Sequence, residues 1–212
     1  ARSVQEQGAQ VLMTAVTHRH PDHTEGAPYF SELTGAPVHA VDPTMRVGGA
    51  GLADGETLRV DGLEIQVIAT PGHTDDSVCF LVEADNVLLT GDTILGHGTT
   101  VIDGDDGLGF YMESLYRLRD LVDEYDVRTL LPGHGPLLNA PEQAIRHYID
   151  HRENRLAQVR DAVEAGAAEV EEVVDRVYPE VTEQLRFAAR SSVRAQLRYL
   201  SYLGELPAHM EA

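Results

Sequence analysis

A single hexapeptide at residues 18–23, His-Arg-His-Pro-Asp-His, places four potential metal ligands on one short loop. The apolar stretch 11–17 before it predicts a buried strand, so the loop leaves the carboxyl end of a strand, where open α/β sheets carry their chemistry. Two of these histidines can aim at one point while the turn through Pro21 swings the other two ligands toward a second. Imidazole and carboxylate ligands suit a cation such as Zn²⁺. The four candidates are His18, His20, Asp22 and His23.

Three more candidate ligands each follow an apolar strand pattern and a turn that contains glycine. They are His73, Asp92 and His134. Glycine lets the backbone pass close to an ion and adopt a positive φ. A lone histidine is more often structural than a ligand, and a His-rich loop can arise by chance. Four strand-end sites in one chain favour a shared metal centre instead.

These motifs resemble those of the metallo-β-lactamase superfamily, from about residue 11 to the C-terminus. The stretch 90–96, the phrase Leu-Pro-Gly-His-Gly-Pro at 131–136 and the segment 151–155 are similar to one branch, beta-lactamase-like protein 2. That branch includes an endoribonuclease, and related thioesterases occur elsewhere in the superfamily. The resemblance implies an α/β fold, an αββα sandwich, followed by a small all-α domain that is winged-helix-like.

The resemblance also implies how the ligands divide. One metal would be held by His18, His20 and His73, the second by Asp22, His23 and His134, and Asp92 would bridge both. Two zinc ions are expected, with Mn or Fe as alternatives, because His and Asp accept all three metals. A hydroxide shared by two such ions is the expected nucleophile. Asp92 would set the metal separation and Asp22 would orient the hydroxide or take its proton, so these two are the expected catalytic residues.

Three other residues are candidates for contact with the substrate. His97 lies in a glycine-flanked loop and is alternatively a solvent-exposed residue. Tyr111 could line the cleft or belong to the core. His151 could reach the metal pocket or pin the C-terminal helices to the rest of the chain.

The pattern of the chain changes near residue 140. Before that point strand patterns alternate with turns, including hairpin signals at Asp61-Gly62 and at 84–86. After it, helical periodicity dominates. We therefore expect two domains, a catalytic domain over residues 1–140 and a helical, winged-helix-like domain over residues 141–212. Helices are expected over about 113–125, 142–165, 170–178 and 182–203.

The superfamily normally places strands before its histidine motif, whereas only 17 residues precede His18. A sheet without its opening strands would leave a long exposed edge. The N-terminal part of the catalytic domain is therefore expected to be missing from this chain.

The formal net charge of −19 disfavours a chain whose main task is non-specific nucleic-acid binding. No apolar run approaches a membrane span and no signal-peptide pattern begins the chain. Cys79 is the only cysteine and sits in an apolar run, so we expect a core thiol and a reducing cytoplasm. All 16 basic residues are arginine, which with abundant Ala, Gly, Val and Asp predicts a GC-rich bacterial source.

A four-residue spacing aligns four arginines on one face of the last expected helix. They are Arg186, Arg190, Arg194 and Arg198. This arginine face could track the phosphates of RNA. Alternatively it pairs with the acidic helix that carries Glu169, Glu171, Glu172 and Asp175, which the strongly negative net charge favours.

Taken together, these features favour a binuclear metal-dependent hydrolase acting on a small ester, thioester or lactam-like carbonyl. An endoribonuclease acting on single-stranded RNA is the alternative, favoured by the branch resemblance and disfavoured by the charge. A non-catalytic winged-helix regulator with a structural metal site is a second alternative, although structural zinc sites normally fill their coordination with protein ligands. The expected partner is a small molecule, with RNA as the alternative and no membrane.

Overall fold

The computed structural model describes residues 6–102, 104 and 106–206. Its larger sheet has five strands in the order β3-β4-β5-β6-β7. The pairs β3–β4, β4–β5 and β5–β6 are antiparallel, and the pair β6–β7 is parallel. A smaller sheet pairs β1 and β2 in parallel. The strands are β1 (Thr14–Ala15), β2 (Val38–His39), β3 (Thr57–Val60), β4 (Leu63–Ala69), β5 (Val78–Val82), β6 (Val87–Gly91) and β7 (Thr129–Pro132).

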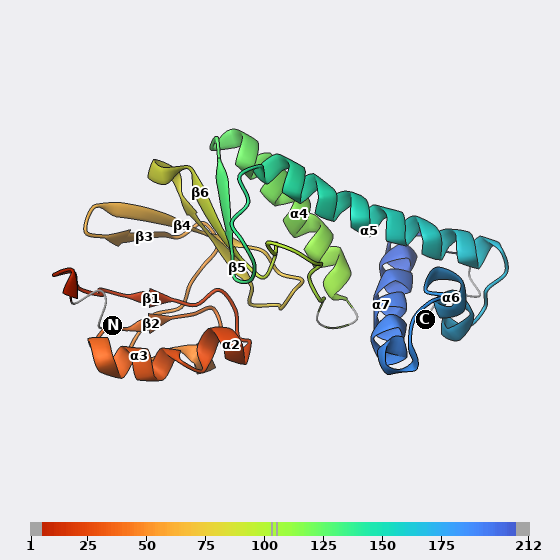
Figure 1. Cartoon of the computed structure of the whole chain (residues 1–212), viewed down its shortest axis with the longest axis horizontal. Coiled ribbons are helices and arrows are strands. Elements are labelled where there is room, and N and C mark those ends of the chain that lie inside the picture. The colour runs from red at the N-terminus through yellow and green to blue at the C-terminus, as the bar shows by residue number, and fades with distance from the viewer. Residues whose placement is uncertain (1–5, 103, 105, 207–212) are drawn as a thin grey trace.

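Helices cover the outer faces of the two sheets. In Figure 1, α3 lies outside the smaller sheet, whereas α4 and α5 lie on the far side of the larger one. This order of helix, sheet, sheet and helix confirms the predicted αββα sandwich. The helices are α2 (Pro21–Thr24), α3 (Ala27–Thr34), α4 (Gly107–Glu124), α5 (Pro141–Glu164), α6 (Val170–Val177) and α7 (Glu183–Tyr202), with short 3-10 turns at Pro43–Met45 and Glu83–Asp85.

The hairpin between β3 and β4 forms where the sequence predicts it. Asp61 and Gly62 both adopt positive φ, 48° and 85°, as a two-residue turn with the twist of the flanking strands requires. Along β4 and β5, alternate side chains face opposite sides of the sheet. Val67 and Phe80 face the smaller sheet, and Ile68 and Cys79 face α4. The prediction of a core thiol at Cys79 is thus confirmed.

The smaller sheet is shorter than the apolar runs 11–17 and 38–41 predict. The reason lies at its carboxyl end, where the chain leaves its partner strand. The carbonyl of Thr17 accepts a hydrogen bond of 2.9 Å from the N–H of Val78, the first residue of β5. This bond turns the chain toward the larger sheet one residue before His18, so the histidine loop begins between the two sheets.

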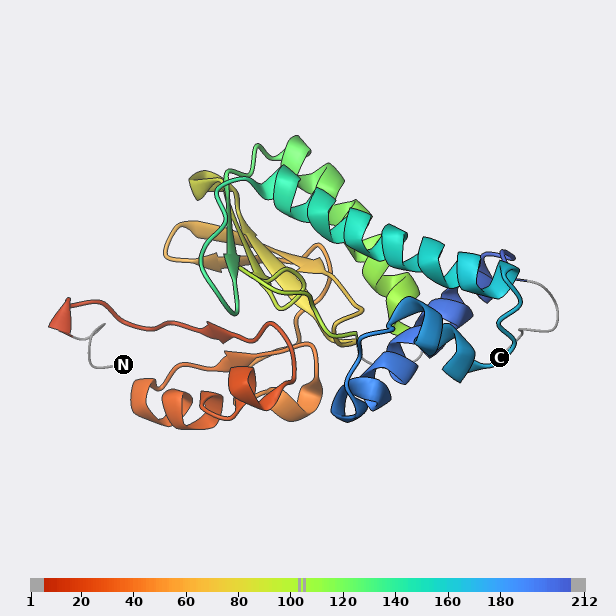
Figure 2. The same ribbon diagram turned by 45° about the vertical axis from the view of Figure 1, so that its right-hand side comes forward.

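The C-terminal part is helical, as expected, and within residues 141–206 the structure contains no strand. Both views place α6 and α7 beside the C-terminal half of α5 (Figures 1 and 2). One cluster of buried apolar residues runs from Leu88 in β6 through Leu115 in α4 to Leu197 in α7. The helices therefore share a core with the larger sheet, and a division into two domains at residue 140 stays a prediction. No described helix is long and apolar enough to cross a bilayer.

Candidate metal centre

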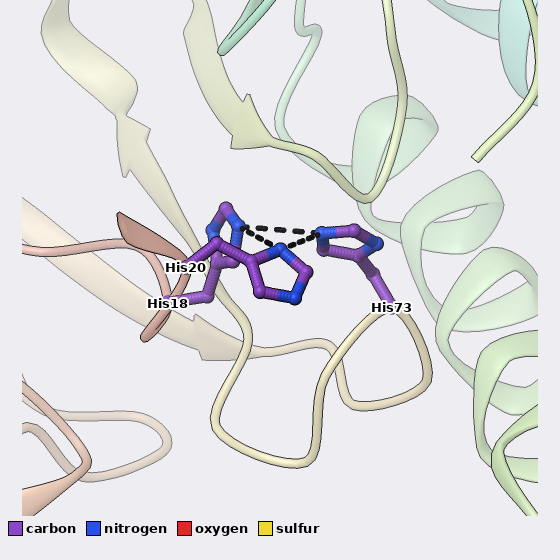
Figure 3. Close-up of side chains that lie close together, drawn as sticks. All are labelled: His18, His20 and His73. Atoms are coloured by element: carbon purple, nitrogen blue, oxygen red, sulfur yellow. Dashed lines mark hydrogen bonds between the residues drawn. The ribbon is translucent and has the colours of Figure 1, made fainter. Parts of the chain in front are cut away.

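Three imidazoles from two separate loops meet at one point (Figure 3). His73 Nε2 lies 3.2 Å from His18 Nε2 and 3.0 Å from His20 Nδ1. The nitrogens of His18 and His20 are 3.2 Å apart. Nitrogens bound tetrahedrally at about 2.0–2.1 Å from one ion would lie roughly 3.3 Å from each other. The spacing therefore fits three ligands of a single cation.

A second group of ligand atoms lies beside the first. His134 Nε2 is 3.2 Å from His23 Nε2 and 3.0 Å from Asp22 Oδ2. His23 Nε2 is 3.7 Å from the same oxygen of Asp22. Two imidazoles and a carboxylate at these distances fit a second cation.

Asp92 lies between the two groups and faces both. Its Oδ1 is 3.4 Å from His23 Nε2, and its Oδ2 is 3.8 Å from His73 Nε2 and 3.4 Å from His134 Nε2. The Oδ1 atom is buried and has no hydrogen-bond partner. An uncompensated buried carboxylate oxygen is costly, and a cation would remove that cost. The fold thus brings together all seven predicted ligands, and their geometry and donor chemistry fit two metal ions.

Glycine is required where the loops approach the centre most closely. A Cβ atom at Gly133 would overlap Asp92 Oδ1 and would lie 2.8 Å from His23 Cε1. The turn that carries His134 can therefore pass behind the Asp92 carboxylate only because residue 133 has no side chain.

Burial keeps two imidazoles of the first group, those of His18 and His73, neutral. Loss of solvent, followed by the proximity of the other histidines, lowers the pKa of His18 to about 3. Loss of solvent also lowers the pKa of His73. The Nδ1 of His73 donates a 2.8 Å hydrogen bond to the Val101 carbonyl, so the lone pair of Nε2 points into the centre. These imidazoles are therefore in the form that binds a metal.

Asp22 and His134 are the two exposed candidate ligands, with side chains that are 58% and 52% exposed. Desolvation opposes the ionisation of Asp22, but a hydrogen bond from its own backbone N–H and the neighbouring His23 and His134 together lower the pKa of its carboxyl group. Asp22 is therefore an accessible carboxylate at the open side of the centre.

The three predicted substrate contacts occupy different settings. Tyr111 is fully buried and its hydroxyl donates to the Thr93 carbonyl at 2.7 Å, so it is a core residue with no surface to offer a substrate. His97 is exposed to solvent, as the alternative interpretation expects, and lies against Gly135, one residue beyond His134. His151 is half-buried and lines a cavity next to the centre. Contact of His97 and His151 with substrate stays a prediction.

Sequence reasoning missed two arginines near the centre. Arg19 pairs with Asp75, and its Nη1 lies 3.4 Å from Asp76 Oδ1, so it ties the first histidine loop to the loop that follows His73. Two features of the sequence could have indicated a role for Arg19. It lies between the candidate ligands His18 and His20, and the acidic residues Asp75 and Asp76 closely follow His73. Arg152 was missed because nothing in its local sequence sets it apart from the other arginines of α5.

The chain belongs to the metallo-beta-lactamase superfamily. The family model described as "Metallo-beta-lactamase superfamily" matches residues 2–134, which hold all seven candidate ligands.

Two fungal relatives illustrate the sequence similarity. The lactamase-like protein adaB of Aspergillus niger is 32% identical over 205 residues, which cover 88% of this chain and 62% of that protein. The atrochrysone carboxyl ACP thioesterase of Aspergillus fumigatus is 35% identical over 157 residues, which cover 71% of this chain and 46% of that protein. The chain thus spans less than two thirds of these relatives. Their fungal origin gives the predicted bacterial source no support.

Solved structures confirm the fold. A metallo-beta-lactamase family protein from Thermus thermophilus superimposes with a TM-score of 0.72 at 25% identity, covering 96% of this chain and 79% of that one. A beta-lactamase domain protein from Burkholderia ambifaria gives a TM-score of 0.76 at 21% identity, covering 96% and 73%. Both alignments extend through the C-terminal helices, because they cover nearly the whole chain.

Proposed function

We propose that this chain hydrolyses the thioester bond of a small acyl substrate, using two divalent metal ions, most simply zinc. The observation that carries the proposal is the pair of ligand groups that share Asp92, whose buried Oδ1 lacks any hydrogen-bond partner. The relative named as a thioesterase supports the choice of bond, because it is 35% identical over 71% of this chain.

When bound, the two ions would supply an activated water and polarise the scissile carbonyl. The chain's own residues do the rest. Asp22 accepts a proton from the attacking water at Oδ2, because it is an accessible carboxylate at the open side of the centre. Asp92 holds the two ligand groups at a constant separation. The hydrogen bond between His73 and the Val101 carbonyl fixes the orientation of one ring, so little reorganisation is required during turnover.

The contacts of the arginine face weigh against RNA as the substrate. Arg186 Nη2 donates to Glu171 at 2.8 Å and to Asp175 at 2.7 Å, and Arg190 also pairs with Glu171. Two of the four arginines of this face thus pair with the acidic helix, as the alternative interpretation predicts, and are not free to bind phosphate. A small-molecule partner and a cytoplasmic location remain our expectations.

The test uses the full chain, stripped of metal and reconstituted with zinc. Elemental analysis should give about two zinc ions per chain, because the geometry offers two ligand groups. Matched substrates with one acyl group, presented as thioester, ester and lactam, should show preferred hydrolysis of the thioester, which a chelator abolishes and zinc restores. Cleavage of labelled RNA with a steep salt dependence, lost when Arg190 and Arg194 are both neutralised, would overturn the proposal in favour of a ribonuclease.

A further inference from the structure

A cavity of about 520 Å³ lies beside the metal centre, between residues 99–102 and 104 on one side and helices α5 and α7 on the other. Much of its described lining is apolar, including Val101, Ile102, Leu108, Leu185 and Phe187. Its volume falls in the range of roughly 300–1,000 Å³ that is common for small-molecule sites. The cavity is therefore large enough to hold a substrate group.

The side chains of the cavity lining that can carry a charge near neutral pH are all basic. Three basic side chains of α5 line the cavity, and no acidic side chain appears among its described lining residues. This is unusual in a chain with a formal net charge of −19. The basic residues are His151, Arg152 and Arg155. Loss of solvent and the two neighbouring arginines lower the pKa of the His151 ring, so the arginines carry the positive charge.

Arg152 is the least satisfied of the three. The residue is only 9% exposed, its Nη2 donates to the Thr100 carbonyl, and its Nε is buried without a hydrogen-bond partner. Among the described residues it forms no ion pair. The Tyr111 ring, 5.2 Å from the Arg152 Cζ, offsets only part of the cost of burying the charge. A buried guanidinium without a carboxylate is costly, and an anionic ligand would compensate it.

Two neighbouring groups strengthen this interpretation. Gln196, 3% exposed, also lines the cavity and has a buried Oε1 without a hydrogen-bond partner. Arg155 stacks over Tyr178, with its Cζ 4.5 Å from the ring centroid, and within the described part of the chain no carboxylate pairs with it. Arg155 Nη1 donates to Gln158 Oε1 at 2.7 Å and to the Val177 carbonyl at 3.2 Å, so its charge has hydrogen-bond partners but no counter-ion among the described residues. Two buried polar atoms at the cavity, Arg152 Nε and Gln196 Oε1, lack any partner, although buried polar groups in folded proteins are normally paired.

The cavity is joined to the metal centre by one short backbone segment. Val101 lines the cavity, and its carbonyl accepts the hydrogen bond from His73 Nδ1. Thr100 accepts from Arg152 through its carbonyl, and its Oγ1 donates to the Asp92 carbonyl at 2.9 Å. A group bound in the cavity would therefore lie one backbone segment away from two ligand residues.

We infer that this cavity is the acyl subsite of the enzyme and that it selects an acyl group with an apolar body and a carboxylate. The apolar lining would receive the body, and Arg155 together with Arg152 would bind the carboxylate. This inference rests on the proposed thioester hydrolysis. A phosphate on the leaving group would offer the same charge, so the experiment separates acyl group from leaving group.

The main test compares two N-acetylcysteamine thioesters, whose leaving group carries no phosphate. One has a 4-carboxybenzoyl group and the other a 4-methylbenzoyl group. Arg155→Gln should raise KM for the carboxylated substrate about tenfold, the loss expected for a charge-assisted hydrogen bond, and leave KM for the methylated one within about twofold. Arg146→Gln is the matched control, because Arg146 lies on the same helix but pairs with Glu142 outside the cavity.

Binding is measured separately from turnover. Terephthalate should bind the full chain more tightly than 4-methylbenzoate in calorimetry, and Arg155→Gln should remove the difference. Ala188→Trp should weaken binding of both acids, because Ala188 is an exposed residue of α7 at which a large ring would fill the cavity. This variant needs no change in the core, so its folding is not at risk.

An equal effect of Arg155→Gln on both thioesters would overturn the inference. Sensitivity to Arg155 that appears only with coenzyme A thioesters, and for both acyl groups alike, would assign the arginine to the leaving group and also overturn it. Arg155-dependent binding of terephthalate by a chain that hydrolyses no thioester would leave the cavity assignment standing while the proposed function fails.

Discussion

The metal centre and the neighbouring cavity use basic side chains in opposite ways. In the centre, histidine nitrogens lie 3.0–3.2 Å from each other and close to two carboxylates. Burial lowers the pKa of His18 to about 3 and also lowers the pKa of His73, so these two rings are neutral and offer lone pairs to a cation. In the cavity, Arg152 cannot lose its proton on burial, because a guanidinium stays charged in proteins. It therefore attracts an anion.

This contrast shows how the fold treats two kinds of buried nitrogen in neighbouring sites. A histidine relieves its burial cost by giving up its proton, whereas an arginine needs a counter-ion. A substrate with a carbonyl at one end and an anionic group at the other would meet both requirements together. Four substitutions test the comparison, from the largest expected effect to the smallest.

Asp92→Ala should have the largest effect, because the two carboxylate oxygens of Asp92 lie 3.4–3.8 Å from histidine nitrogens of both ligand groups. We expect loss of bound metal and a fall in kcat/KM on the order of a thousandfold or more. Elemental analysis after dialysis and thioester kinetics measure the two effects. Asp85→Ala, which removes an exposed carboxylate from the turn before β6, should change neither. Two metals retained by Asp92→Ala would refute its bridging role.

Leu197→Ala tests whether the helices and the larger sheet form one core. Leu197 is 1% exposed and belongs to the cluster that reaches β6. The free energy of unfolding should fall by about 2–5 kcal/mol, as for other large-to-small core substitutions, with the metal content unchanged. Urea unfolding followed by fluorescence and circular dichroism should show a single transition, and Leu33→Ala on exposed α3 should have little effect. Separate melting of the helices would instead support the domain division predicted at residue 140.

Gly133→Ala should weaken the metal centre without touching the cavity. The added methyl group would displace Asp92 or His23, so we expect zinc affinity to fall by about tenfold or more. Competition with a chromophoric chelator measures the affinity. Gly26→Ala is the control, since a Cβ there meets no atom within 4 Å. If the zinc affinity of Gly133→Ala is unchanged, the loop can move to accommodate the added methyl group without weakening the metal site.

Arg190→Gln should have the smallest effect. Its pair with Glu171 is exposed, and exposed ion pairs contribute little to stability. Turnover of the carboxylated thioester should also stay at the wild-type level, in contrast to Arg155→Gln. Thermal melting and the same kinetic assay check both statements. A large loss of turnover would place the arginine face, and not the cavity, in contact with the substrate.

The sequence by itself determined which candidate ligands the fold brings together, and it determined the larger sheet. Each candidate ligand follows directly on a strand pattern and a turn, so its place in the fold depends mainly on local structure. The hairpin at Asp61-Gly62 was predictable for the same reason, because the turn chemistry of two residues sets its register. The starts and ends of the last three helices were also close to those expected, since proline and glycine mark them.

Some residues are surrounded by parts of the chain that are distant in sequence. Only the tertiary structure decided whether these residues are buried, paired or lining a cavity. The pairing of Arg186 depends on how α7 packs against α6. The burial of Tyr111, and an Arg152 that has no ion-pair partner among the described residues, depend on how α4 and α5 pack near residues 99–102. Helical periodicity tells which face of a helix is apolar, but not which partner covers it or where a space is left. The metal ligands could therefore be predicted from motifs, whereas the cavity beside them became visible only once the helices were packed.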